Sequence, residues 1–301
     1  MLSTKPQPPL ALLGDVSVDE AIMKCIVGDW DRVQSTYIGD SGWSWPLRVS
    51  LVKDDSTTRR YFIAKGDLGM SMLRGEYESM SLLYSIIPDN VVKPLAWGIC
   101  SSQPDHSFYI SSFYDLINEQ PDMQQFCTMV ARFHEGSSEL FEQAKIHPKP
   151  QGRFGFHLTT HMGAFPQDND WCDSWEEIFA RGMRKILDYE NDAQGSSMEL
   201  ASLAVNLLEK VIPRLLRPME THVRSLRSSL VHGDLQIRNV KKDKGTQKPL
   251  IFDAGSFWGH NESHYSGNTE PRELALDDMR YLVEKYPCGY DYIAASDSPT
   301  S

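Results

Sequence analysis

The sequence predicts an α+β protein with two lobes, a small β-rich N-terminal lobe and a larger helical C-terminal lobe. Alternating, β-branched segments dominate the chain up to residue 112, and long helical patterns dominate the remainder. The 301 residues, of which 41% are hydrophobic, suffice to bury a substantial core. We expect a flexible, Pro-rich N-terminus over 1–14, the N-terminal lobe over 15–116, and the C-terminal lobe over 117–301 with a short C-terminal end.

Turn residues and apolar spacing define the elements of the N-terminal lobe. A polar turn over 54–59 separates two alternating segments, which together read as a hairpin. Apolar residues three or four positions apart indicate a helix after that hairpin. In order, we expect a short helix within 16–27, strands over 47–52 and 61–65, a helix over 72–86, and strands over 91–98 and 107–112.

The joint between the lobes is placed at 113–120, where the pattern changes from alternating to helical. A segment rich in Gly, Pro and Asn interrupts the helical patterns and reads as an insertion. The expected elements of the C-terminal lobe are helices near 123–136, over 174–188 and over 197–216, with the insertion at 148–173.

Composition excludes several classes of protein. Thirty Lys and Arg stand against 41 Asp and Glu, a net charge of −11, so we expect no nucleic-acid partner. The five cysteines are scattered, which indicates neither a disulfide framework nor a zinc site. No apolar segment approaches the roughly 18 residues that a membrane span requires, and the apolar run at the N-terminus is too short for a signal peptide. We therefore expect a cytoplasmic protein without a membrane partner.

The strongest local signal is an Asp, an Asn five positions later, and a second Asp at the end of an apolar strand. These residues are Asp234, Asn239 and Asp253, and the first follows His232-Gly233. The spacing matches the catalytic machinery of protein-kinase-like phosphotransferases. Asp234 would orient an attacking hydroxyl and accept its proton, and Asn239 and Asp253 would hold Mg2+ through oxygen ligands. Alone, a His-Gly-Asp triplet also occurs in ordinary turns, and an Asp after a strand often caps a helix.

Two further residues stand where a kinase-like N-terminal lobe needs them. Lys65 ends a strand and Glu76 lies on the next helix, as expected for a Lys that binds ATP phosphates and a Glu that holds it. The order of the pair relative to Asp234 favours this interpretation over a solvated Lys and a surface Glu. Gly39 and Gly42 precede a strand and could cover the phosphates of ATP, although an ordinary hairpin loop explains them equally well.

Three blocks of sequence resemble the fructosamine-3-kinase and ketosamine-3-kinase (protein-ribulosamine 3-kinase) family, within the aminoglycoside-phosphotransferase-like division of the kinase fold. The similarity covers about residues 30–265. The blocks are His232-Gly233-Asp234-Leu235, the segment from Ile251 through Asp253-Ala254-Gly255-Ser256-Phe257-Trp258-Gly259 to His260, and the insertion with Gly152-Arg153-Phe154-Gly155-Phe156, Pro166-Gln167, Asn169, Trp171 and Trp175.

The resemblance implies a bilobal kinase that uses ATP and Mg2+ to phosphorylate the sugar 3-hydroxyl of ketosamines, free or on protein lysines, as a step of deglycation. It also implies that backbone groups of Ser112, Phe113 and Tyr114 bind adenine. We assign the acceptor site to three residues, Gln236, Trp171 and His260. For Trp171, a packing pair with Trp175 is the alternative.

The chain departs from the family pattern beside the catalytic Asp. Gln236 stands where the family usually has Trp, and Arg238 where it has Gly; after Tyr265 the similarity weakens. Two alternatives therefore stay open: a phosphotransferase of the same fold with another small acceptor, such as an aminoglycoside- or choline-like compound, or a kinase-like binding module without turnover. The joint presence of all five expected site residues argues against the second: Lys65, Glu76, Asp234, Asn239 and Asp253.

Overall fold

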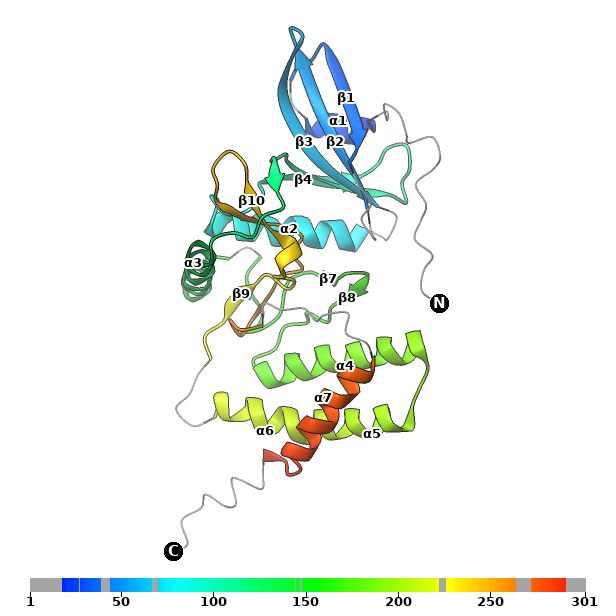
Figure 1. Cartoon of the computed structure of the whole chain (residues 1–301), viewed down its shortest axis with the longest axis vertical. Helices are drawn as coiled ribbons and strands as arrows, with labels where there is room; N and C mark the ends of the chain where they lie inside the picture. Colours follow the sequence, from blue (N-terminus) through cyan, green and yellow to red (C-terminus); the bar gives the residue numbers. More distant parts are fainter. Residues whose placement is uncertain are drawn as a thin grey trace, which may run out of the picture.

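The N-terminal part of the chain is built on one antiparallel sheet. The structure, a computed structural model, describes residues 18–26, 28–38, 44–66, 70–143, 145–146, 148–221, 226–263 and 272–290. The sheet has five strands in the order β1-β2-β3-β5-β4 (Figure 1). Their bounds are β1 Arg32–Tyr37, β2 Trp45–Lys53, β3 Ser56–Gly66, β4 Pro94–Ile99 and β5 Ser107–Ser112.

The turn between β2 and β3 explains their tight pairing. Asp54 and Asp55 both have positive φ angles, 51° and 58°, which suit the right-handed twist of a two-residue hairpin connection. Alternate residues of β2, namely Leu47, Val49 and Leu51, are buried in one core cluster under the short helix α1 (Glu20–Cys25). The predicted hairpin is thus confirmed, with strands longer than the sequence indicated.

Helix α2 (Met70–Ile86) connects the sheet with the rest of the molecule. Leu73, Met80 and Leu83 are buried along one face at helical spacing. They belong to the largest core cluster of the described residues, together with Tyr109 of β5 and Leu230 from the C-terminal part of the chain. One hydrophobic core therefore joins the two parts and fixes the sheet relative to the loops that carry the site.

The C-terminal part combines helices with short strands (Figure 1). Strand β10 pairs with β11 and β6, β9 pairs with β12, and β7 pairs with β8. The strands are β6 Leu116–Ile117, β7 His161–Met162, β8 Phe165–Pro166, β9 Ser229–Val231, β10 Val240–Asp243, β11 Pro249–Ile251 and β12 Phe257–Gly259. The helices are α3 Met123–Glu142, α4 Trp175–Gln194, α5 Met198–Asn206, α6 Ile212–Leu216 and α7 Arg272–Lys285. Among the described helices, none is long and apolar enough to cross a membrane.

The α+β fold class with a β-rich first part and a helical second part is confirmed. One predicted helix is different in detail: the segment 197–216 contains a π-helical turn over Leu207–Val211 before α6. Pro213 follows that turn and has no amide hydrogen to donate, which disfavours a regular helix there. The lobe boundaries stay predictions, and the expected flexible segment 1–14 lies outside the described residues.

Candidate active site

The loop after β9 carries Asp234 and depends on a close backbone contact. Gly233 has a φ angle of +82°, and a Cβ atom there would lie 2.1 Å from the carbonyl oxygen of Gly255. A Cβ atom on Gly255 would in turn lie 2.3 Å from the carbonyl oxygen of His161. Such distances exclude any side chain. The catalytic loop, the loop after Asp253 and the insertion therefore stack backbone on backbone.

Asp234 is held by the amide side chain of Asn239. The Asn239 Nδ2 donates to the main-chain oxygen of Asp234 at 3.0 Å and to its Oδ2 at 2.8 Å. A short 3-10 turn over Ile237–Asn239 brings the two residues together, and Asn239 is buried. Since the amide nitrogen is used toward Asp234, the oxygen on the other branch of the amide points away from it. The predicted pair is thus assembled by local structure.

His232 supports the same loop through a hydrogen bond. Its ring is fully buried, and burial lowers the pKa of His232 to about 4, so the ring is neutral at physiological pH. The main-chain N–H of Asp234 donates to His232 Nδ1 at 3.3 Å, which a neutral ring can accept. His232 is therefore a structural residue of the loop rather than a proton donor.

Asp253 reaches the site through the β10–β11 hairpin. Val240 pairs with Ile251, and the N–H of Phe252 donates to the carbonyl oxygen of Asn239 at 3.2 Å. Asp253 then turns out of the strand with a φ angle of +64°, in the left-handed region that Asp tolerates better than most residues. The hairpin thus places the second carboxylate beside the Asn239–Asp234 pair.

Three carboxyl groups influence one another at this point. Burial, and next the neighbouring Asp234, raise the pKa of Asp253 to about 6. Burial, and next Asp253, raise the pKa of Glu76 well above its usual value. Asp253 reaches solvent, although its carboxyl group is recessed among protein atoms. A cation placed here would relieve the repulsion between these groups.

The donors at this position fit magnesium better than a transition metal. Among the described residues, no group of three or more His, Cys, Asp or Glu could hold a metal ion. Mg2+ usually binds one or two carboxylates together with phosphate oxygens and water. Asp253 and the amide oxygen of Asn239 supply such a partial set of oxygen ligands.

The structure describes some of the predicted nucleotide-binding residues and not others. Lys65 is the penultimate residue of β3, opposite Phe108 of β5, but its side chain lies outside the description, as do Gly39 and Gly42. Ser112 N donates to the carbonyl oxygen of Lys93, and Phe113 N donates to that of Arg60. Because both amide groups already donate hydrogen bonds within the protein, a purine base would have to bind other backbone atoms of this segment, which ends at Tyr114.

The three residues assigned to the acceptor site lie in different surroundings. Gln236 contacts Asp234 directly: its Nε2 lies 3.0 Å from Oδ1 and 2.9 Å from Oδ2. The ring of His260 lies beside that of Trp175, with centroids 6.0 Å apart. Trp171 is half-buried and packs against the main core cluster. An acceptor role for these residues stays a prediction.

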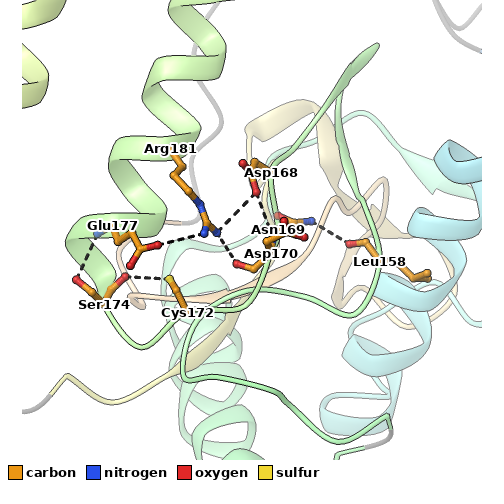
Figure 2. Close-up of polar contacts among 8 residues, drawn as sticks. All are labelled: Leu158, Asp168, Asn169, Asp170, Cys172, Ser174, Glu177 and Arg181. Atoms are coloured by element: carbon orange, nitrogen blue, oxygen red, sulfur yellow. Dashed lines mark hydrogen bonds and ion pairs between the residues drawn. The ribbon is translucent and has the colours of Figure 1, made fainter.

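The insertion supplies polar residues to which sequence reasoning gave no role. Gln167 Nε2 and Thr160 Oγ1 donate to the carbonyl oxygen of Gly255, at 2.9 and 3.2 Å. Asn169 Nδ2 donates to Thr160 Oγ1 at 2.7 Å and to the carbonyl oxygen of Leu158 at 3.2 Å; the second bond is drawn in Figure 2. The buried hydroxyl of Thr160 thus connects the insertion to the loop after Asp253.

An arginine on α4 contacts residues near the C-terminal end of the insertion (Figure 2). Arg181 lies 3.6 Å from Asp168 and 3.4 Å from Glu177, and it also donates to the carbonyl oxygen of Asp170. These contacts tie the insertion to the helix that follows it. The Glu177–Arg181 pair has the i,i+4 spacing of a helix, but no spacing in the sequence indicates the contacts of Arg181 with Asp168 and Asp170, because these partners lie on a loop.

This chain is similar in sequence to several known kinases. The family model described as fructosamine kinase matches residues 48–266. Ketosamine-3-kinase of Mus musculus is 36% identical over 204 residues, which are 64% of this chain and 62% of the mouse protein. The chloroplastic protein-ribulosamine 3-kinase of Arabidopsis thaliana is 24% identical over 266 residues, 86% of this chain and 73% of that protein. The matched segment therefore spans less than two thirds of the mouse relative.

Solved structures show the same fold. A Thermobifida fusca protein provisionally named fructosamine-3-kinase superposes with a TM-score of 0.57 at 18% identity, covering 87% of this chain and 79% of the other. The aminoglycoside phosphotransferase APH(4)-Ia, in a ternary complex with AMP-PNP and hygromycin B, gives 0.51 at 12% identity, covering 90% and 83%. The kinase-like fold predicted from the sequence is confirmed.

Proposed function

Because the chain belongs to the fructosamine kinase family, we propose that it transfers the γ-phosphoryl group of ATP to the 3-hydroxyl of the sugar in ketosamines, free or attached to protein lysines. The observation that carries this proposal is the assembly of Asp234, Asn239 and Asp253 in one place, with Asn239 bonded to Asp234. Phosphorylation of the sugar would be a step in removing the adduct. A cytoplasmic location remains a prediction.

Asp234 is the residue to which we assign proton transfer. Its carboxylate accepts a hydrogen bond from the acceptor hydroxyl and takes up that proton as the hydroxyl oxygen bonds to the γ-phosphorus. The bond from the γ-phosphorus to the bridging oxygen breaks at the same time, and ADP leaves with that oxygen. The main role of Asp234 is to orient the hydroxyl, because phosphoryl transfer depends mostly on positioning and charge stabilisation.

Asn239 and Asp253 would hold magnesium against the phosphates. The bound ion supplies positive charge that stabilises the phosphate oxygens during transfer. Asn239 contributes in a second way, since its Nδ2 fixes the Asp234 carboxylate. Burial, and next the neighbouring Asp253, raise the pKa of Glu76. In a kinase-like site, a Glu on this helix would pair with the Lys that binds the phosphates, which is the role we propose for Glu76.

The surroundings of Asp234 favour one alternative acceptor class. Where the family usually has an aromatic ring, this chain has the amide of Gln236, which is bonded to Asp234 and to Arg238. A sugar would have no indole ring on which to stack at that position. A phosphotransferase for a different small hydroxyl compound is therefore the second candidate.

ATP consumption with a panel of acceptors decides between these functions. The panel contains a free ribulosamine, a free fructosamine, an aminoglycoside and choline, each with ATP and Mg2+. We expect turnover with the ketosamines. Turnover with an aminoglycoside or choline alone would replace the proposed acceptor by the second candidate, and no turnover with any acceptor would refute both.

The variant Asp234→Asn tests the role of the carboxylate. We expect it to abolish transfer and leave ATP affinity nearly intact, because the carboxylate acts on the acceptor hydroxyl and not on the nucleotide. Titration calorimetry with a non-hydrolysable ATP analogue and Mg2+ measures the affinity. As a control, Arg227→Leu removes a charge from an exposed ion pair with Glu142 and should change neither quantity. A large loss of ATP binding in Asp234→Asn would contradict the assigned role.

A further inference from the structure

The two residues that depart from the family pattern form one hydrogen-bonded chain with the catalytic carboxylate. Arg238 donates through Nε and through a terminal nitrogen to the Oε1 of Gln236, at 3.2 and 3.0 Å. Gln236 Nε2 then lies within 3.0 Å of both oxygens of Asp234. The chain of contacts runs from an exposed guanidinium through a half-buried amide to the carboxylate.

Chemistry fixes the direction in which the amide points. A guanidinium has only donors and a carboxylate has only acceptors, so an amide between them has a single satisfying orientation. In the flipped orientation the amide oxygen would face the carboxylate and its N–H groups would face the donors of Arg238. The orientation of Gln236 is therefore determined by its two neighbours and does not depend on how nitrogen and oxygen are told apart.

The consequence is a carboxylate that accepts hydrogen bonds from two amide side chains. Asn239 donates to Oδ2, and Gln236 donates to both oxygens. Hydrogen bonds that involve a charged group are stronger than neutral ones, so together they restrict rotation of the carboxylate. An acceptor hydroxyl would then meet an oxygen whose direction is already set, which is how positioning raises the rate of transfer.

We propose that Gln236 and Arg238 act together as one positioning device for Asp234, in which Arg238 acts only through the amide of Gln236. This inference rests on the proposed phosphoryl transfer, and it assigns both residues to the reaction rather than to the recognition of the acceptor. Without the guanidinium, the oxygen of the amide loses its donors, and the amide is held only by its contact with Asp234.

Steady-state kinetics of four variants test the proposal: Gln236→Leu, Arg238→Leu, Arg238→Lys and the double Leu variant. We expect Gln236→Leu to lower kcat roughly tenfold, the size expected for losing a hydrogen bond to a charged group, with the KM for ATP unchanged. Arg238→Leu should lower kcat several-fold, and Arg238→Lys should restore most of that loss because an ammonium still donates to the amide oxygen. Arg227→Leu controls for the loss of one positive charge.

The double variant gives the decisive comparison. If Arg238 acts through Gln236, the double variant is no slower than Gln236→Leu alone. If the two losses multiply, or if Gln236→Leu is as fast as the wild type or faster, the proposal is wrong. A change confined to the KM of the acceptor would also overturn it, because that result indicates recognition of the acceptor instead of positioning.

A thermal unfolding cycle separates this proposal from the proposed function. The melting temperatures of Asp234→Asn, Gln236→Leu and their combination report the contact without any substrate. We expect the two shifts to be non-additive by roughly 2 °C. If no acceptor is phosphorylated and the cycle is still non-additive, the proposed function fails while the contact stands; additive shifts refute the contact itself.

Discussion

Replacing Asp253 by Asn should make the protein more stable at neutral pH when magnesium and nucleotide are absent. Asp253 lies close to Asp234 and Glu76, and burial with this negative charge raises its pKa to about 6. Ionisation of Asp253 therefore lowers the free energy of unfolding when no cation is present. Asn keeps the shape, accepts the φ angle of +64° and carries no charge.

The magnitude follows from the pKa difference. A rise from 3.8 to about 6 is about two pH units, which corresponds to at most about 3 kcal/mol. Because Asp253 reaches solvent, screening reduces this value, and we expect about 1 kcal/mol and a rise in Tm of roughly 2 °C. Between pH 3.8 and about 6 the folded state binds more protons than the unfolded state, so the wild type loses stability as the pH rises through this window. The benefit of Asn should therefore vanish below about pH 4 and be complete above about pH 6.

Thermal unfolding in EDTA across pH 4 to 8 measures this difference. Asp115→Asn is the matched control, because the hydrogen bond with Arg60 lowers the pKa of Asp115, and its replacement should destabilise the protein at neutral pH. With Mg2+ and an ATP analogue, the wild type should gain stability and Asp253→Asn should gain much less. A lower Tm for Asp253→Asn at pH 7.5, or a benefit that persists at pH 4, would refute the reasoning.

Three substitutions test other parts of the structure. Gly233→Ala should lower kcat on the order of a hundredfold, because the added Cβ meets the carbonyl oxygen of Gly255 and displaces the loop. The control Gly182→Ala on α4, with open space around it, should leave kcat unchanged and raise the free energy of unfolding by about 0.5–1 kcal/mol. Equal kinetics for the two variants would contradict the stacked-backbone contact. Glu220→Gln should lower the free energy of unfolding in urea by about 1–2 kcal/mol, because the Glu220 carboxylate accepts hydrogen bonds from the N-terminus of α4, including Trp175 N at 3.0 Å. An unchanged midpoint of unfolding would show that an amide serves equally well.

The sequence predicted that the site residues lie close together because the structure that brings them together is local. The 3-10 turn over Ile237–Asn239 and the β10–β11 hairpin return the chain to its starting point within about twenty residues, so local structure already brings Asp234, Asn239 and Asp253 together. A short spacing in the sequence therefore predicts that the three residues lie together, and the role of each residue stays a prediction.

Elements that depend on tertiary contacts were not predictable. Strand β1 has mostly exposed residues and lacks an alternating pattern, so only its pairing with β2 defines it. Helix α7 lies beyond the region of family resemblance, and the structure shows Leu276 and Met279 packed in the cluster around α5 and α6. The Gln236–Arg238 contact depends on side-chain rotamers, which spacing does not determine. The sequence identified Arg238 only as a departure from a pattern, and it assigned Gln236 to the acceptor site rather than to a contact with Arg238.

The insertion gives the site a rigidity that the catalytic loop lacks by itself. Gly233 and Gly255 have no side chains, so only backbone contact and hydrogen bonds fix the distance between their loops. That distance is fixed from the other side, where Thr160 and Gln167 of the insertion donate to the carbonyl oxygen of Gly255. Because the same carbonyl oxygen lies against Gly233, the position of Asp234 is linked to the insertion through a single peptide group. The insertion therefore supports the loop that carries Asp234.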